Sequence, residues 1–375
     1  MKIAFVKYAG LASGGTEKYL QTIALLLKRE GHEVDYYYTN VARLIGRDWQ
    51  HPPNDINRKK ILEEAGIKTV ECYIDYKVCG QTPEVWHGTD FFEKFDESEY
   101  DIIVSGRQGQ PEYPFSEIKN TKIIDTIHGT WASGTHQSNI KKCILISQEQ
   151  RQKWLSNGGN DDKCVVIPSV VSVPESYPTD FREKNNIPSD AFVYGLHQRD
   201  DPSIFSPVSL ECFSRLENKN TYMVILGGSS AHRDYVKNNN IDRVVFVDHS
   251  SSLDVIHSFL DAIDVYAHSR LDGEVCSAAI IEAMYHGKPV ITCPGTSENG
   301  HMEQIENCGS WCSTDSEYVS EMTKLCEDTD YYSEKSSLTK SKYEKKYKCS
   351  VVEQQLLQVF NEVKNMDNYN VEISK

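Results

Sequence analysis

The regular alternation of short apolar runs with helical patterns constrains the fold of this chain most. Residues 16–30, for example, place Leu20, Ile23 and Leu27 on one helical face, and Gly31 then ends the pattern. Strands are expected in the first half at Lys2–Tyr8, Val34–Tyr38, Lys68–Tyr73, Asp101–Ser105, Lys122–Ile127, Cys143–Ser147 and Val165–Pro168. This alternation predicts an α/β fold in which helices cover both faces of a parallel sheet.

The alternation is interrupted between Val170 and Asp180, where Pro174 and Pro178 break the periodicity. We interpret this stretch as an interdomain linker. Strands are expected again at Phe192–His197, Tyr222–Leu226, Val244–Asp248, Val265–Ser269 and Val290–Cys293, with helices near 207–216, 253–262 and 282. A chain of 375 residues exceeds the usual size of one hydrophobic core, so two domains are expected.

The composition excludes several classes of function. A net charge of −15 argues against a nucleic-acid partner, because phosphate backbones need a basic surface. The apolar runs are far shorter than a membrane span, and the N-terminus resembles a strand rather than a secretory signal. Eleven cysteines without a C-x-x-C pair indicate reduced thiols and a cytoplasmic protein. Arg58-Lys59-Lys60 and the basic run 335–348 are either solvated helix faces or sites of weak peripheral membrane contact.

Two carboxylates in the second half, Glu274 and Glu282, are separated by seven residues. If every step between them were helical, their Cα atoms would lie about 12 Å apart. That distance suits the two ends of an elongated polar ligand, such as a sugar nucleotide. It is too long for a carboxylate pair that acts on one glycosidic bond, which needs about 5 to 9.5 Å. The spacing alone is also typical of a solvated helix face.

The surrounding residues decide between these interpretations. The stretch 264–305 resembles the donor-binding half of glycosyltransferase family 4, whose members are retaining enzymes with the GT-B architecture. The matching segments are Asp264-Val265-Tyr266-Ala267-His268-Ser269, Glu274, Cys276-Ser277-Ala278, Glu282-Ala283-Met284-Tyr285-His286-Gly287-Lys288-Pro289-Val290 and Asn299-Gly300-His301-Met302-Glu303-Gln304-Ile305. The family usually has a glycine where Ser277 stands, which is a mild departure.

A second match lies in the glycine-rich turn of residues 10–17, between the first expected strand and helix. By itself this segment could be a tight turn or an anion site at a helix start. It is not the G-x-G-x-x-G of dehydrogenases. Gly14, Gly15 and Glu17 resemble the family's G-G-x-E, and Gly31-His32-Glu33-Val34 resembles the G-H-x-V that follows. In the family these glycines lie near the donor diphosphate or the acceptor.

Further single residues resemble the family pattern. His128 follows the strand 122–127, at the position of a histidine that commonly points at the 6-hydroxyl of the transferred sugar, although a lone histidine is more often structural. Ser147 is expected to cap the next helix. Arg199 resembles the arginine that clamps the diphosphate, with its register displaced by a residue or two. The lysine that usually follows about five residues later is missing, which puts the strength of the clamp in doubt.

The resemblance implies a GT-B fold of two Rossmann-like domains that face each other across a cleft, with a C-terminal helix that crosses back to the first domain. An acceptor-side domain would span 1–172 together with the helix 351–375, and a donor-binding domain would span 173–350. Candidate catalytic residues are His128, Arg199 and Glu274, and Glu17 belongs to the acceptor side. Donor binding would involve Gly14, Gly15, Arg199, Glu274, the helix start at Cys276, Ser277 and Ala278, and Glu282.

The implied activity is that of a retaining hexosyltransferase. It would transfer a sugar from a nucleotide-diphosphate donor, by frequency a UDP-sugar, to a hydroxyl of a glycan, lipid or protein. Glu274 would hold sugar hydroxyls and Glu282 the ribose hydroxyls. No cofactor or metal is expected, and Asp328-Thr329-Asp330 lies in a polar helical tail. A catalytically silent sugar-nucleotide-binding subunit is the alternative, which the missing lysine favours. Sugar-nucleotide epimerisation or phosphorolysis fits the motifs less well.

Overall fold

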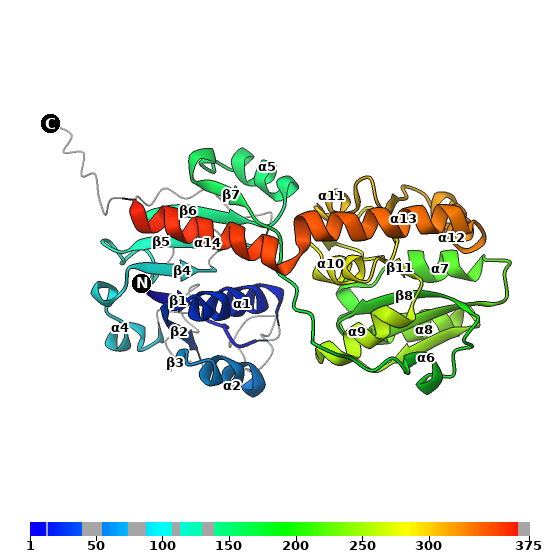
Figure 1. Ribbon diagram of the computed structural model, residues 1–375, viewed down its shortest axis with the longest axis horizontal. Coiled ribbons are helices and arrows are strands. Elements are labelled where there is room, and N and C mark those ends of the chain that lie inside the picture. The colour runs from blue at the N-terminus through cyan, green and yellow to red at the C-terminus, as the bar shows by residue number, and fades with distance from the viewer. Residues whose placement is uncertain (13, 40–54, 74–87, 107–112, 130–138, 367–375) are drawn as a thin grey trace. The chain divides into compact units, whose positions relative to one another are not determined.

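A computed structural model describes residues 1–12, 14–39, 55–73, 88–106, 113–129 and 139–366 (Figure 1). Ser13, Cys79, Thr130 and the last part of the expected helix 351–375 lie outside the described residues. The chain divides into two compact units. Unit 1 comprises Met1–Pro168 and Val352–Lys375, and unit 2 comprises Ser169–Val351.

Unit 1 is built on a parallel sheet of seven strands, in the order β3-β2-β1-β4-β5-β6-β7. Adjacent strands lie in a fixed register, for example Ile3 beside Val34 on one side and Ile102 on the other. The strands are β1 (Lys2–Val6), β2 (Glu33–Thr39), β3 (Lys68–Cys72), β4 (Ile102–Ser105), β5 (Lys122–Ile127), β6 (Ile140–Leu145) and β7 (Cys164–Val166). Its helices are α1 (Gly15–Arg29), α2 (Ile56–Glu64), α4 (Phe91–Lys94), α5 (Gln148–Ser156) and the short η2 (Glu97–Glu99) and η3 (Asp161–Lys163).

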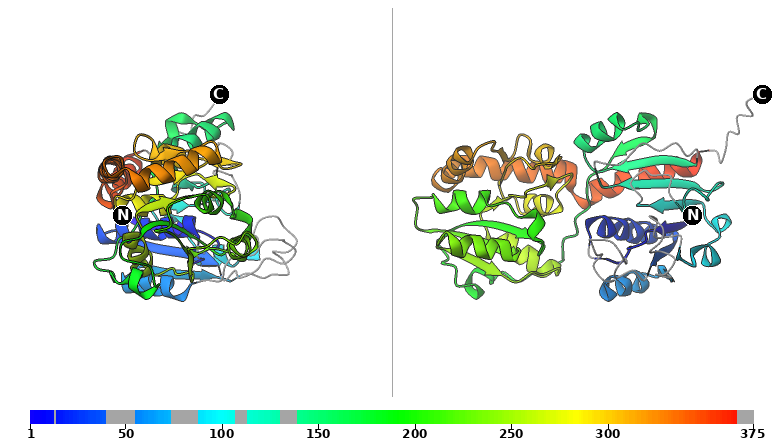
Figure 2. Two further views of the ribbon diagram at one scale, coloured as in Figure 1. Left: turned by 90° about the vertical axis from the view of Figure 1, so that its right-hand side faces the viewer. Right: turned by 180° about the vertical axis from the view of Figure 1, so that it is seen from behind.

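The first residues of the final helix, α14 (Cys349–Asn365), belong to unit 2. From Val352 onward the helix belongs to unit 1. Its buried face consists of Val352, Leu356, Val359, Phe360 and Val363. Polar contacts at both ends fix its place: Arg29 Nη2 of α1 lies 2.9 Å from a Glu353 carboxylate oxygen, and Lys122 Nζ donates to the Lys364 carbonyl at 2.9 Å. Front and rear views show α14 and α1 along the same sheet (Figures 1 and 2). The prediction of a C-terminal helix that returns to the first domain is confirmed.

Unit 2 repeats the same strand order with the sheet β10-β9-β8-β11-β13-β15, again parallel throughout. The strands are β8 (Phe192–Gln198), β9 (Thr221–Gly227), β10 (Val244–Val247), β11 (Val265–Ala267), β13 (Val290–Thr292) and β15 (Ser310–Trp311). A separate parallel pair joins β12 (Gly273–Glu274) to β14 (Glu298–Asn299). The helices are α6 (Phe181–Lys184), η4 (Pro202–Ile204), α7 (Val208–Ser214), α8 (Ser230–Asn238), α9 (Leu253–Ala262), α10 (Ala278–Tyr285), α11 (His301–Ile305), α12 (Asp315–Glu327), α13 (Thr329–Lys342) and η5 (Tyr343–Tyr347).

Both strand orders are those of a Rossmann fold, in which the order reverses between two central strands. The reversal falls between β1 and β4 in unit 1 and between β8 and β11 in unit 2. Ligands of such sheets bind beyond the carboxyl ends of the strands at this point. The residues that follow β1 and β4 in unit 1, and β8 and β11 in unit 2, are therefore the first places to look for a site.

The basic run near the C-terminus has partners inside unit 2. Lys335 Nζ donates to the Gly309 carbonyl at 3.1 Å, and Lys342 Nζ donates to the Glu303 and Glu306 carbonyls at 2.8 Å each. Lys340 Nζ donates to the carbonyl of Tyr285, the last residue of α10. Cations at helix carboxyl ends are stabilised by the helix dipole. These three lysines therefore hold α13 against its neighbours.

Other features of the described residues bear on the sequence predictions. All ten described cysteines are free thiols. Asp328 caps α13 by accepting a hydrogen bond from the Tyr331 amide at 2.9 Å, so Asp328-Thr329-Asp330 stands at the start of a helix. The described part of the chain contains no cluster of three or more His, Cys, Asp or Glu side chains arranged to hold a metal ion. Within that part, no helix has both the length and the apolar character needed to cross a membrane.

Candidate functional site

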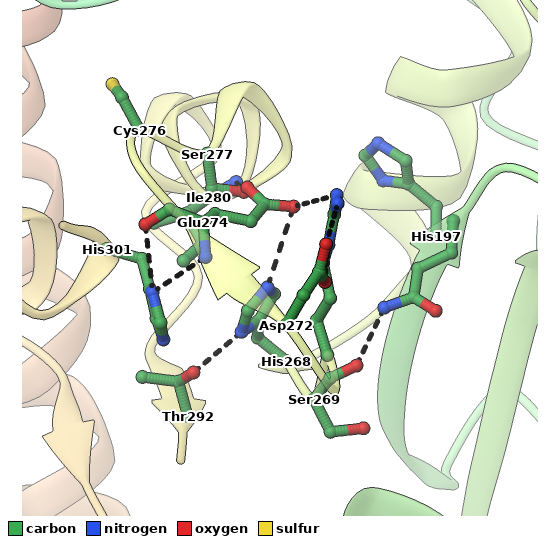
Figure 3. Close-up of polar contacts among 12 residues, drawn as sticks. His197, His268, Ser269, Asp272, Glu274, Cys276, Ser277, Ile280, Thr292 and His301 are labelled. Atoms are coloured by element: carbon green, nitrogen blue, oxygen red, sulfur yellow. Dashed lines mark hydrogen bonds and ion pairs between the residues drawn. The ribbon is translucent and has the colours of Figure 1, made fainter. Parts of the chain in front are cut away.

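Polar side chains gather where the order of the unit 2 sheet reverses. His197 and Gln198 end β8, and His268 and Ser269 directly follow β11 (Figure 3). Gln198 joins the two strand ends, because its side-chain Nε2 donates to the Ser269 carbonyl at 2.7 Å. The loop after β11 then leads to β12, which carries Glu274. The two carboxylates predicted from the sequence thus belong to one unit and one edge of its sheet.

Glu274 points toward two basic side chains (Figure 3). One carboxylate oxygen accepts a hydrogen bond from Arg270 Nη1 at 3.2 Å and lies 3.9 Å from His268 Nε2. Burial alone would raise the pKa of Glu274, but His268, Arg270 and Ser277 together hold that pKa well below its usual value. Glu274 is therefore a stable carboxylate, suited to accept hydrogen bonds and unsuited to act as a proton donor.

Glu282 lies on α10 and is only 3% exposed. One of its carboxylate oxygens is 3.4 Å from His197 Nε2 of β8. The His197 ring is packed edge-on against Phe259 and Tyr266, with centroids 6.0 and 5.8 Å away. The helix thus directs this carboxylate at the carboxyl end of β8, toward the interior of unit 2 and away from bulk water.

The start of α10 is held by side chains from two places. Ser277 is the N-cap, and its hydroxyl accepts a hydrogen bond from the Ile280 amide at 3.4 Å. The Ser277 amide itself donates to Gln304 Oε1 at 2.7 Å, so it is engaged within the protein. The first-turn amides of Ala278 and Ala279 are the ones that a helix leaves without an intrahelical acceptor. Burial raises the pKa of the neighbouring Cys276 thiol to about 11, so that thiol is protonated.

Two glycines allow the Glu274 loop to approach its neighbour closely. Gly273 has φ +76°, and a Cβ placed on it would overlap the Glu298 carbonyl. A Cβ on Gly295 would overlap the backbone of Gly273 in turn. The β12–β14 pair therefore needs glycine at both positions.

Arg199, the predicted diphosphate clamp, lies just beyond β8 and is 59% exposed. Its Nε and Nη2 donate to one oxygen of Asp201 at 3.1 and 2.8 Å. Asp201 also accepts from the Ser203 amide and hydroxyl, which lower the pKa of its carboxyl together with Arg199. Five residues after Arg199, where the family usually has a lysine, stands the buried Ile204. A ligand anion would have to compete with Asp201 for this guanidinium.

The predicted residues of unit 1 lie at the corresponding edge of its sheet. Glu17, in the first turn of α1, pairs with Lys7 directly after β1, with 3.5 Å between Nζ and the carboxylate; both side chains are largely buried. A Cβ on Gly14 would overlap the Glu17 carboxylate, whereas a Cβ on Gly15 would meet open space. His128 follows β5 and packs edge-on against Tyr19, with centroids 4.9 Å apart. Burial, aided by Lys7, lowers the pKa of His128 to about 3, so its ring is neutral.

Ser147 is the N-cap of α5, and its hydroxyl accepts a hydrogen bond from the Gln150 amide at 3.1 Å, as predicted. Several residues that contact the predicted ones were given no role of their own from the sequence. His268, His301 and Gln304 occur in the matching segments without an assigned contact, and Arg270 and Lys7 were not named. Lys7 and His268 each follow an apolar strand directly, and this position could have identified them. The roles of His301 and Gln304 depend on contacts with residues about 27 positions earlier, which no local pattern reveals.

Part of this chain matches a known family of glycosyltransferases. Residues 207–328, all in unit 2, match the family model described as Glycosyl transferases group 1. The predicted resemblance is therefore confirmed. None of the curated proteins matches the chain.

Solved structures extend the similarity in fold to nearly the whole chain. HepE of Anabaena, solved in complex with UDP and glucose, is 19% identical with a TM-score of 0.71, over 96% of this chain and 100% of that one. A glycosyltransferase from Rickettsia africae is 18% identical with a TM-score of 0.75, over 98% and 99%. Sucrose-phosphate synthase from Thermosynechococcus elongatus is 15% identical with a TM-score of 0.71, over 97% and 99%. The fold is that of GT-B glycosyltransferases, with two Rossmann-like units.

Proposed function

We propose that this protein is a retaining glycosyltransferase that transfers a hexose from a UDP-sugar to an acceptor hydroxyl. The observation that carries the proposal is the placement of Glu274 and Glu282. Both carboxylates lie at the carboxyl edge of one Rossmann sheet, within the stretch that matches the group 1 glycosyltransferase model, and neither points into bulk solvent. A sugar nucleotide presents hydroxyls at both ends, and two separated carboxylates can accept hydrogen bonds from them.

The donor is a UDP-sugar in this proposal because a structure of the same fold, HepE, was solved with UDP and with UDP-glucose. Glu282, deep in unit 2, would accept hydrogen bonds from the two ribose hydroxyls. Glu274, held as a carboxylate by Arg270 and His268, would accept hydroxyls of the sugar. Charge-assisted hydrogen bonds of this kind are about twice as strong as neutral ones.

The diphosphate gains negative charge as the bond between the sugar and its oxygen breaks. In our proposal the amides of Ala278 and Ala279 and the Arg199 guanidinium stabilise that charge. Neither a metal ion nor another cofactor is required for this role. The leaving oxygen would take the acceptor's proton on the same face of the sugar, which retains its configuration without a protein nucleophile. His128, neutral at physiological pH, would contribute hydrogen bonding and no charge.

The test is donor consumption by the purified full-length chain. Incubation with UDP-glucose and other UDP-sugars, followed by measurement of released UDP, should show turnover that increases with a suitable acceptor. In parallel, calorimetric titration with UDP, GDP and ADP should show the tightest binding for UDP. A chain that binds none of these nucleotides, alone or as sugar conjugates, would refute the proposal.

One observation favours a second candidate, a catalytically silent subunit that binds a sugar nucleotide. The cation that should stabilise the leaving group is bonded to Asp201, and the buried Ile204 stands where a lysine usually follows. A protein that binds UDP-glucose but releases no UDP with any acceptor would support this candidate.

A further inference from the structure

A short helix supports the loop that carries Glu274. The helix is α11, residues His301–Ile305, and it follows the β14 strand. His301 and Gln304 are three positions apart, so they lie on the same face of the helix. Both side chains are buried, at 0% and 1% exposure. Each contacts the backbone of the loop, at Glu274 and Ser277, which are also three positions apart.

The Gln304 side chain is hydrogen-bonded to both the backbone amide and the backbone carbonyl of Ser277. Its side-chain Oε1 accepts from the Ser277 amide at 2.7 Å, and its Nε2 donates to the Ser277 carbonyl at 3.1 Å. The same Nε2 lies 3.5 Å from Cys276 Sγ. A buried amide is stabilising only when both its donor and its acceptor are satisfied. The two hydrogen bonds therefore fix one orientation of the residue that begins α10.

His301 holds the other end of the loop. Its Nε2 lies 3.1 Å from the Cys293 carbonyl, and its Nδ1 lies 3.2 Å from the Glu274 carbonyl and 3.3 Å from the Glu274 amide nitrogen. Burial lowers the pKa of His301, which keeps the ring neutral. In either tautomer the neutral ring bonds to the Glu274 backbone, because an unprotonated Nδ1 accepts from the amide and a protonated Nδ1 donates to the carbonyl. This contact fixes the backbone directly beneath the Glu274 carboxylate (Figure 3).

We propose that Gln304 and His301 are positioning residues that fix the Glu274–Ser277 backbone and thereby the donor site. The inference rests on the proposed function. It gives a role to two polar side chains that are buried at 0% and 1% exposure. With the Ser277 amide engaged by Gln304, the first-turn amides of Ala278 and Ala279 are presented to the donor diphosphate in a single geometry.

Replacing Gln304 by glutamate gives a variant whose behaviour should depend on pH. The ionised carboxylate can accept from the Ser277 amide but cannot donate to the Ser277 carbonyl, so one hydrogen bond is lost at pH 7.5. Burial raises the pKa of a carboxyl group, and the protonated form regains the donor at mildly acidic pH. Recovery of Gln304→Glu as the pH falls to 5.0 is therefore the expected signature. Gln304→Met, of similar size but without polar atoms, should not recover.

Several titratable groups surround this side chain. Burial raises the pKa of each neighbouring thiol and phenol, so none of them ionises between pH 5.0 and 7.5: Cys276, Cys308 and Tyr347. At the adjacent turn, the Lys342 ammonium donates to the Glu303 carbonyl and also lies near the carboxylate of Glu306. These groups are shared with the parent chain, so each comparison is between variant and parent at the same pH.

Two readouts are measured on the full chain. Amide hydrogen exchange of the 274–278 segment, without ligand, should be about tenfold faster in Gln304→Glu than in the parent at pH 7.5 and within about threefold at pH 5.0. Calorimetric affinity for UDP-glucose should fall about tenfold and recover in the same way. In Gln304→Met, amide exchange should stay faster and the affinity for UDP-glucose lower than in the parent at both pH values. Met302→Gln, at a 49% exposed position of the same helix, should match the parent throughout.

The inference is overturned if Gln304→Glu and Gln304→Met match the parent at pH 7.5, or if folded Gln304→Glu fails to recover at pH 5.0. Should Gln304→Glu not fold, the exchange and affinity of Gln304→Met decide alone. A parent that binds neither UDP-glucose nor another nucleotide sugar refutes the proposed function. The exchange readout needs no ligand, so it still shows whether Gln304 holds the loop.

Discussion

Replacing Glu282 by alanine offers the most direct test of the ribose assignment. The carboxylate is 3% exposed, and one of its oxygens lies 3.4 Å from His197 Nε2. Two hydrogen bonds to a charged acceptor contribute about 1.5 to 3 kcal/mol each, but the partner hydroxyls regain water when the site is opened. We therefore expect a net loss of about 3 kcal/mol, or roughly 150-fold, in affinity for UDP.

The assay is calorimetric titration of the parent and Glu282→Ala with UDP and with 2′-deoxy-UDP. In the parent, loss of one ribose hydroxyl should weaken binding about tenfold, since it leaves a buried carboxylate partly unsatisfied. In Glu282→Ala the two ligands should bind equally, because the acceptor is gone. Glu306→Ala, at an exposed position, is the matched control. Equal discrimination between the two ligands in Glu282→Ala and the parent would refute the reasoning.

Three further variants test other parts of the site. Arg270→Met should weaken UDP-glucose about tenfold but leave UDP nearly unchanged, since it frees the Glu274 carboxylate from its 3.2 Å partner; equal losses in titrations of both ligands would contradict this. Gly273→Ala should lower stability by about 2 kcal/mol or more in denaturant unfolding, because φ is +76° and the methyl would overlap the Glu298 carbonyl; an unchanged midpoint would show that the loop adapts. The pKa of His128 is lowered from 6.5 to about 3 in the folded chain, so below pH 6.5 the unfolded chain takes up a proton that the folded chain excludes, and stability falls. His128→Gln should therefore reduce the acid-induced fall in melting temperature between pH 6.5 and 4. Parallel curves for the variant and the parent would contradict this.

The fold could be predicted from local patterns because both sheets are parallel and buried. Strands such as Lys122–Ile127 and the helix Leu253–Ala262 were located to the residue, since apolar runs and helical periodicity survive without tertiary information. The two-residue strands β12, β14 and β15 were missed. Strands this short, at Gly273–Glu274 for example, have no periodicity and exist only because a partner segment lies beside them.

In the candidate site, too, residues within local motifs could be predicted and long-range contacts could not. Glu274 and Glu282 could be found because they sit in a motif of fixed offsets. Their partners could not, because the pairing of Glu282 with His197 joins residues that are far apart in sequence. The sequence also gave no sign that the Ser277 amide would be engaged by Gln304, since that contact depends on the close passage of two loops at Gly273 and Gly295. Long-range hydrogen bonds of this kind follow from topology rather than from composition.

The place of α14 has a consequence for the order of events during synthesis. The residues that complete the hydrophobic interior of unit 1, from Val352 to Val363, are translated after all of unit 2. A nascent chain therefore reaches the ribosome exit with its first half still lacking a helix, and with the apolar surface that this helix will cover open to water. Unit 2 contains its own strands and helices in one continuous stretch and can fold first. The hydrophobic interior of unit 1 can therefore be completed only after the residues from Val352 to Val363 have been translated.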